Sequence, residues 1–114
     1  MKKIIVGCAI VFINSATFIS NASAASFGYA VPISVLQESN VLHVEFDAAA
    51  PRSGLPSCAS RTYIDLTTNG GKVRASLALT AFAAGKEVFF YISDGITSCQ
   101  WSSSVPNNWL RVRN

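Results

Sequence analysis

The segment from Gly70 to Gly85 is the strongest helix candidate in the chain, and it limits the fold more than any other stretch. Alanine and leucine dominate this segment, and both residues favour helix. Thr68 or Asn69 can cap the first turn, and Gly85 stands where a helix exit favours a left-handed residue. Apolar residues occupy two sides of the predicted helix, so both sides should be covered. Because one small sheet covers only one side, the segment predicts a fold and also a contact with a partner.

Residues 1–24 have the three parts of a secretory signal peptide. A lysine pair is followed by an apolar run and then by the small-residue cleavage site Ala22-Ser23-Ala24. The apolar run is too short to favour a membrane span. We therefore expect an exported protein, periplasmic or secreted, with a single domain over residues 25–114 and no membrane span.

The charge of the predicted mature domain is close to zero. The whole chain carries nine Lys and Arg against six Asp and Glu, which gives a net charge of +3. Two of those nine are Lys2 and Lys3, so removal of the signal peptide leaves seven against six, or about +1. The remaining basic residues form no concentrated stripe. We therefore predict no nucleic-acid partner.

Cysteine usage predicts one disulfide bond. Cys8 lies in the signal peptide, so the mature domain keeps only Cys58 and Cys99. In an exported domain a single pair most simply forms a disulfide. Such a bond would close a loop of about forty residues and stabilise the fold by about 4 kcal/mol in the chain-entropy model. A domain of this small size is marginally stable and would benefit from it. There is no Cys-x-x-Cys motif and one histidine, so we expect no redox site, no metal site and no cofactor.

Strand-like segments flank the helix. They cover residues 26–37, 41–47, 61–66, 87–92 and 108–113, with loops predicted over 48–57 and 93–107. The order is strand, strand, strand, helix, strand, strand, which is the order of the OB-fold, a small five-stranded Greek-key barrel. The alternative is a plain antiparallel sheet with one helix across it. We favour the OB-like barrel because a barrel leaves fewer open edges.

Catalytic residues are scarce. His43 is the only histidine, and on an alternating strand it shares a face with Glu45 and Asp47, which we expect to point to solvent. Three such residues on one strand make a poor closed metal site. No Gly-x-Ser-x-Gly motif accompanies the plentiful serines. We therefore predict that the protein is not an enzyme, and rank a small hydrolase that uses His43 last.

A binding surface is better supported. Trp101 lies in a loop rich in amides and hydroxyls, with Gln100, Ser102 and Asn107 close by in the sequence. An indole can stack on the C–H face of a sugar while polar neighbours bind its hydroxyls. We therefore name Trp101, Gln100, Ser102 and Asn107 as candidate ligand-binding residues. The alternative is that Trp101 folds over the disulfide and caps the core.

The mature chain resembles a group of small exported bacterial proteins that are largely uncharacterised. The resemblance rests on Arg61-Thr62-Tyr63-Ile64-Asp65, the helix followed by Gly85-Lys86-Glu87-Val88, then Cys99, Trp101 and Asn108-Trp109-Leu110-Arg111-Val112. The layout of that group is similar to the B subunits of AB5 toxins of the subtilase cytotoxin and pertussis-like families. This similarity implies an OB-fold, assembly into a pentameric ring, and binding to cell-surface glycans.

A ring of that kind would bury the outer side of each helix against neighbouring subunits. The residues that would make this homo-oligomer contact are Ala75, Ala78, Leu79 and Phe82. The alternative is that Leu79 and Phe82 cover the barrel mouth within a monomer. The resulting expectation is a non-enzymatic binding module for a cell-surface glycan. The second hypothesis is an exported inhibitor or envelope accessory protein that acts by protein–protein contact, with an envelope protein as its partner.

Overall fold

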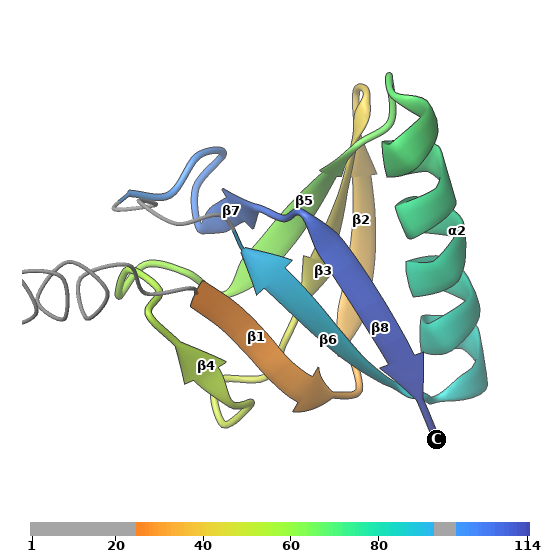
Figure 1. Ribbon diagram of the computed structural model, residues 1–114. Helices are drawn as coiled ribbons and strands as arrows, with labels where there is room; N and C mark the ends of the chain where they lie inside the picture. Colours follow the sequence, from red (N-terminus) through yellow and green to blue (C-terminus); the bar gives the residue numbers. More distant parts are fainter. Residues whose placement is uncertain (1–24, 93–97) are drawn as a thin grey trace, which may run out of the picture.

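The computed structural model describes residues 25–92 and 98–114 (Figure 1). The predicted signal peptide lies outside the described residues. The described residues form short strands and one helix. In chain order these are β1 (Ala25–Ala30), β2 (Ser34–Glu38), β3 (Val41–Glu45), β4 (Arg52–Ser53), β5 (Arg61–Asp65), α2 (Asn69–Ala84), β6 (Glu87–Ile92), β7 (Ser104–Pro106) and β8 (Trp109–Arg113).

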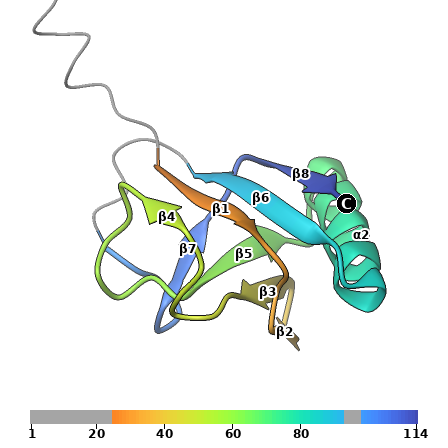
Figure 2. The same ribbon diagram turned by 90° about the horizontal axis from the view of Figure 1, so that it is seen from below.

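The strands form two sheets of four strands each (Figures 1 and 2). The first sheet has the order β4-β1-β6-β8 and is antiparallel, whereas the second has the order β2-β3-β5-β7 and pairs β5 with β7 in parallel. The prediction of a mainly β fold with one helix is confirmed. The prediction of a five-stranded OB barrel is wrong, because the described strands divide between two sheets and do not close into one barrel.

The division begins inside the segment predicted as the first strand, residues 26–37. Its first half is β1, which pairs with β6, and its second half is β2, which pairs with β3. Pro32 lies between the halves, has no N–H for a ladder, and restricts the backbone of Val31. The ladder therefore breaks at Pro32, and the two halves belong to different sheets.

Two further strands lie in segments predicted as loops. β4 pairs with β1 inside the predicted loop 48–57. β7 lies inside the predicted loop 93–107, and its Val105 is fully buried opposite Thr62 of β5. Both strands are too short to give a periodic signal, since each has two or three residues.

The hydrophobic core lies between the two sheets. Phe27 of the first sheet stacks on Phe46 at 5.0 Å between ring centroids, and Phe90 meets Phe46 edge-on at 5.9 Å. All three rings are almost completely buried. In the part of the chain that the structure describes, no helix is both long and apolar enough to cross a membrane.

The helix α2 begins and ends as the sequence predicts. The Thr68 hydroxyl accepts a hydrogen bond of 2.9 Å from the Gly71 N–H, and Gly85 ends the helix with φ of 67°. The helix contacts β5 and β2 of the second sheet and β8 and β6 of the first (Figure 1). It therefore holds both sheets together along one side of the domain.

The side of α2 that faces the sheets is made of the smallest side chains. Its buried residues are Gly71, Ala75, Ala78 and Ala81. Ala75 and Ala78 are 5% and 0% exposed, so these two predicted oligomer-contact residues are buried within the domain instead. The other two, Leu79 and Phe82, are 44% and 36% exposed and do reach the surface.

Small side chains are required here because the backbone of α2 approaches the end of β5 closely. A Cβ at Gly71 would lie 1.7 Å from the Asp65 carbonyl oxygen, whereas a Cβ at Gly70 would meet only the end of the Arg74 side chain at 3.4 Å. Gly71→Ala should therefore lower the free energy of unfolding by about 2 kcal/mol through overpacking. Gly70→Ala is the matched control and should raise it by about 0.5–1 kcal/mol, because alanine favours helix. Urea denaturation of both variants measures the difference, and equal effects would contradict the close approach.

Candidate ligand-binding site

A pocket of about 390 Å³ lies beside the turn that joins β2 to β3. We call it the Trp101 pocket, and its lining consists of Glu38, Ser39, Asn40, Val41, His43 and Trp101. The lining joins a hairpin to a residue that lies far away in the sequence. The pocket contains a carboxylate, a hydroxyl, an amide and an imidazole beside one indole, which is a mixed polar and aromatic surface.

Trp101 forms one wall of this pocket. Its ring meets the Tyr63 ring edge-on at 4.5 Å and the His43 ring edge-on at 6.3 Å. The residue nevertheless remains 50% exposed. Trp101 therefore covers the buried His43 with one part of its ring and leaves the rest open to the pocket.

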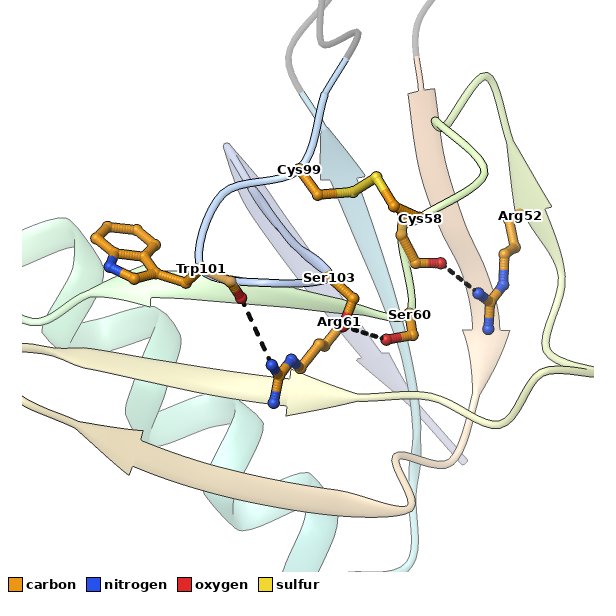
Figure 3. The surroundings of a disulfide bond; sticks show 8 residues. Arg52, Cys58, Ser60, Arg61, Cys99, Trp101 and Ser103 are labelled. Carbon is orange, nitrogen blue, oxygen red and sulfur yellow. Dashed lines mark hydrogen bonds between the residues drawn. A yellow bond between two sulfur atoms is a disulfide. The ribbon is translucent and has the colours of Figure 1, made fainter.

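The loop that carries Trp101 is fixed at several points (Figure 3). The predicted disulfide is confirmed: Cys58 and Cys99 are bonded, with their Cα atoms 6.2 Å apart. The Ser60 hydroxyl donates to the Ser103 hydroxyl at 2.7 Å, and the Arg61 guanidinium donates to the Trp101 carbonyl at 3.5 Å. The position of the indole is therefore set by the start of β5.

Backbone strain is concentrated at this pocket. Among the described residues, the non-glycine residues with positive φ are Ser39 at 56°, Trp101 at 40° and Ser102 at 67°. Ser39 and Trp101 line the pocket, and Ser102 follows Trp101. Such conformations are uncommon for residues with a side chain, and they gather at functional sites more often than elsewhere.

His43 lies at the inner side of the pocket and is only 1% exposed. The prediction that it faces solvent with Glu45 and Asp47 is therefore wrong. Its Nδ1 lies 2.5 Å from the Ser104 hydroxyl, and its Nε2 lies 3.5 Å from a carboxylate oxygen of Glu38. Burial lowers the pKa of His43, the positive charge of Arg61 acts in the same direction, and Glu38 opposes both. The neutral imidazole is therefore favoured in the folded protein.

Ser104, His43 and Glu38 are the residue types of a hydrolytic triad, but a substrate cannot reach the serine hydroxyl. Ser104 is fully buried, so its hydroxyl cannot meet a substrate carbonyl without rearrangement. Glu38 carries the exposed end of the group, with a side chain that is 66% exposed. The arrangement places hydrogen-bonding groups along a pocket wall. Residues 25–92 and 98–114 contain no group of three His, Cys, Asp or Glu that could hold a metal ion.

The other predicted ligand-binding residues, Gln100, Ser102 and Asn107, do not line the Trp101 pocket. The Gln100 side chain accepts a hydrogen bond of 3.1 Å from the Tyr63 hydroxyl, next to the pocket, and Ser102 is exposed at the loop tip. Asn107 is placed elsewhere by internal hydrogen bonds. Its amide donates to the Tyr63 carbonyl and to the Thr62 hydroxyl, and its oxygen accepts from Arg74 at 3.0 Å. Asn107 therefore joins α2 to β5.

Sequence reasoning missed the hairpin half of the pocket. The two-residue turn Ser39-Asn40 fixes the register in which Leu36 lies opposite His43 and Glu38 opposite Val41. Side chains two residues apart share a face, so Glu38 and His43 lie diagonally on one face of the hairpin. This register is the signal that could have found Glu38 beside His43.

A scan against protein-family models found no match, and searches of the curated proteins and of the solved structures found none either.

The buried His43 predicts a loss of stability on acidification. The unfolded chain takes up a proton at His43 as the pH falls through about 6.5, whereas the lowered pKa of the folded state resists this uptake. The contribution of neutral His43 is therefore complete above that pH and is lost as the pH falls toward the lowered value. The free energy of unfolding should be smaller at pH 5 than at pH 7.5. The chain has a single histidine, so His43→Gln should flatten this dependence in urea titrations.

Glu38→Gln should change the pH dependence of stability in the opposite direction from His43→Gln. It removes the charge that raises the pKa of His43, so the loss of stability between pH 7.5 and pH 5 should become steeper. An unchanged slope in both variants would show that His43 is not the group that titrates.

Proposed function

We propose that the chain is an exported, non-enzymatic binding module that holds a neutral glycan in the Trp101 pocket. The observation that carries this proposal is the exposed indole of Trp101, fixed edge-on against Tyr63 at the wall of a pocket with a mixed polar and aromatic lining. Sugars offer a C–H face that stacks on aromatic rings and hydroxyls that need both donors and acceptors. The carboxylate of Glu38, the amide of Asn40 and the Ser39 hydroxyl supply such partners around one ring.

Pre-organisation also supports a binding role. The disulfide, the Ser60–Ser103 hydrogen bond and the Tyr63 ring hold Trp101 in place before any ligand arrives. A wall that is already ordered loses little conformational freedom on binding, and this lowers the cost of association. The buried hydroxyl of Ser104 favours binding over hydrolysis, because this serine, which is hydrogen-bonded to His43, is covered. The disulfide is also compatible with an oxidising, extracytoplasmic compartment.

A relation to AB5 toxin B subunits is part of this proposal. It is supported by the chain order, in which α2 follows β2, β3 and β5 of the second sheet and precedes β6 and β8 of the first. A homo-oligomer would have to use the outer residues of α2, such as Leu79 and Phe82, because Ala75 and Ala78 face inward.

The second candidate function is an exported inhibitor or envelope accessory protein that acts by protein–protein contact. The observation that favours it is the number of large apolar side chains on the surface. Val73 and Leu77 on α2 and Leu36 on β2 are each at least 46% exposed. Protein interfaces commonly use exposed apolar patches of this kind.

The glycan proposal is tested by retention of the oxidised protein on a glycan array, followed by titration calorimetry with a retained neutral oligosaccharide. Trp101→Ala should weaken binding roughly tenfold, because a stacked aromatic residue commonly dominates such a site. The matched control is Trp109→Ala, which removes an indole of similar exposure on the other sheet and should leave glycan affinity unchanged.

Circular dichroism and thermal unfolding establish that both variants are folded. The proposal fails when the wild-type protein is retained by no glycan, or when the two tryptophan variants lose affinity equally. Binding of one envelope protein by a monomer that ignores sugars would favour the second function.

A further inference from the structure

Four aromatic side chains gather on the outer face of the first sheet, away from the Trp101 pocket. Tyr29 of β1 lies 5.4 Å from Phe89 of β6, and Phe89 lies 5.7 Å from Trp109 of β8. Tyr91 stacks on Trp109 at 5.5 Å, with the two planes only 7° apart. These residues alternate along β6 with the fully buried Val88, Phe90 and Ile92. The rings therefore form a continuous row across three adjacent strands.

A shallow pocket opens in this row. It has a volume of about 170 Å³, we call it the Trp109 pocket, and it is lined by Tyr29, Phe89, Trp109 and Arg111. Three of the four lining side chains are aromatic. Trp109 is 43% exposed, so part of its ring surface remains available to a ligand.

Two arginines, Arg111 and Arg113, lie at the Trp109 pocket, and they differ in their ion pairs. Arg113 forms an ion pair with Glu87 at 2.9 Å, and its guanidinium lies 3.6 Å from the centre of the Tyr29 ring. Arg111 lies over the Trp109 ring at 5.9 Å and forms no ion pair with any residue in the described ranges 25–92 and 98–114. Arg111 therefore presents a guanidinium at the pocket that can bind one anionic group.

We propose that the Trp109 pocket binds an extended peptide in which a proline stands next to a glutamate or an aspartate. The pyrrolidine ring packs its C–H groups against the row formed by Tyr29, Phe89 and Trp109, and the neighbouring carboxylate binds Arg111. Aromatic-lined grooves commonly take proline-rich segments, because such segments are already extended and lose little entropy on binding. The guanidinium of Arg111, which has no ion-pair partner in the part of the chain that the structure describes, complements an acidic neighbour.

The lining of the Trp109 pocket favours a peptide over a sugar or a single-stranded nucleic acid, which also stack on aromatic rings. A pyranose carries several hydroxyls, and the side chains of this pocket offer it few polar partners beyond the Tyr29 hydroxyl, the Trp109 ring N–H and Arg111. A single-stranded nucleic acid brings a phosphate with every base, whereas the pocket lining has one arginine, Arg111, that forms no ion pair within the described ranges. A proline ring needs no hydrogen-bond partner, and one carboxylate matches one guanidinium.

This proposal is independent of the glycan proposal. The Trp109 pocket is built on β1, β6 and β8, whereas the Trp101 pocket is built on the β2–β3 hairpin and the loop before β7. Failure of one site therefore leaves the other unaffected, and the Trp101→Ala variant separates the two in a single experiment.

The test measures the heat of binding by isothermal titration calorimetry of the oxidised full chain with blocked five-residue peptides. The probe has four prolines around a central glutamate, and the comparison peptide has glutamine at the centre. The glutamate peptide should bind roughly fivefold more tightly than the glutamine peptide, as expected for an exposed ion pair of about 1 kcal/mol. Trp109→Ala should remove binding of both peptides, and Trp101→Ala should preserve it.

Arg111→Gln tests whether Arg111 binds the carboxylate of the glutamate peptide. It should make the two peptides bind equally, because the partner of the carboxylate is gone. Lys72→Gln, an equal loss of charge on an exposed residue of α2, should preserve the fivefold difference. The proposal is overturned by absence of binding to the wild-type protein, by an unchanged preference in Arg111→Gln, or by an acidic oligosaccharide or a single-stranded oligonucleotide that binds more tightly than the peptide and is lost in Trp109→Ala.

Discussion

The bond between Cys58 and Cys99 is the constraint on which the Trp101 pocket depends. Cys58 stands just before β5, so the bridge ties the segment from residue 98 onward to the central part of the second sheet. Ser60 and Arg61 then add hydrogen bonds to Ser103 and Trp101 along the same edge. Left-handed conformations at residues with side chains cost about 1–3 kcal/mol each, and they persist only where the surroundings hold them. The bridge and these hydrogen bonds hold Trp101 and Ser102 in that conformation.

The same loop explains why His43 is buried. Strand alternation indicates which side chains share a face, but it assigns that face to solvent only when nothing covers it. Leu42 and Val44 face the core, and the opposite face of β3 is covered at His43 by Trp101 and Ser104. A polar residue can remain buried there because both ring nitrogens have polar partners. The covering residues are about sixty positions away in the sequence, which is why the periodicity of β3 gave no sign of them.

Local signals in the sequence were enough for α2, the disulfide and most strand positions. The helix has its own cap at Thr68 and its own exit at Gly85, and β6 has its own apolar run. The sheet arrangement was not accessible in this way. The parallel pairing of β7 with β5 depends on a contact between Thr62 and Val105, and nothing local encodes it. Trp101 was predicted as a site residue from its loop composition, whereas Asn107 has the same composition signal and serves a structural contact instead. Composition identifies residues able to bind a ligand, and only the fold decides which of them are free.

The two tryptophan-walled pockets differ in what surrounds the ring, and this difference follows from the elements that carry them. Trp101 stands on a loop beside a hairpin turn, where turn chemistry supplies Ser39 and Asn40 as polar neighbours. Trp109 stands on a strand, and its neighbours Tyr91 and Phe89 are cross-strand aromatic residues with apolar faces. A turn therefore surrounds one indole with hydrogen-bonding groups, and a sheet surrounds the other with rings. Because a buried polar group of a ligand needs a partner, the two pockets select ligands of different polarity even though each presents an indole.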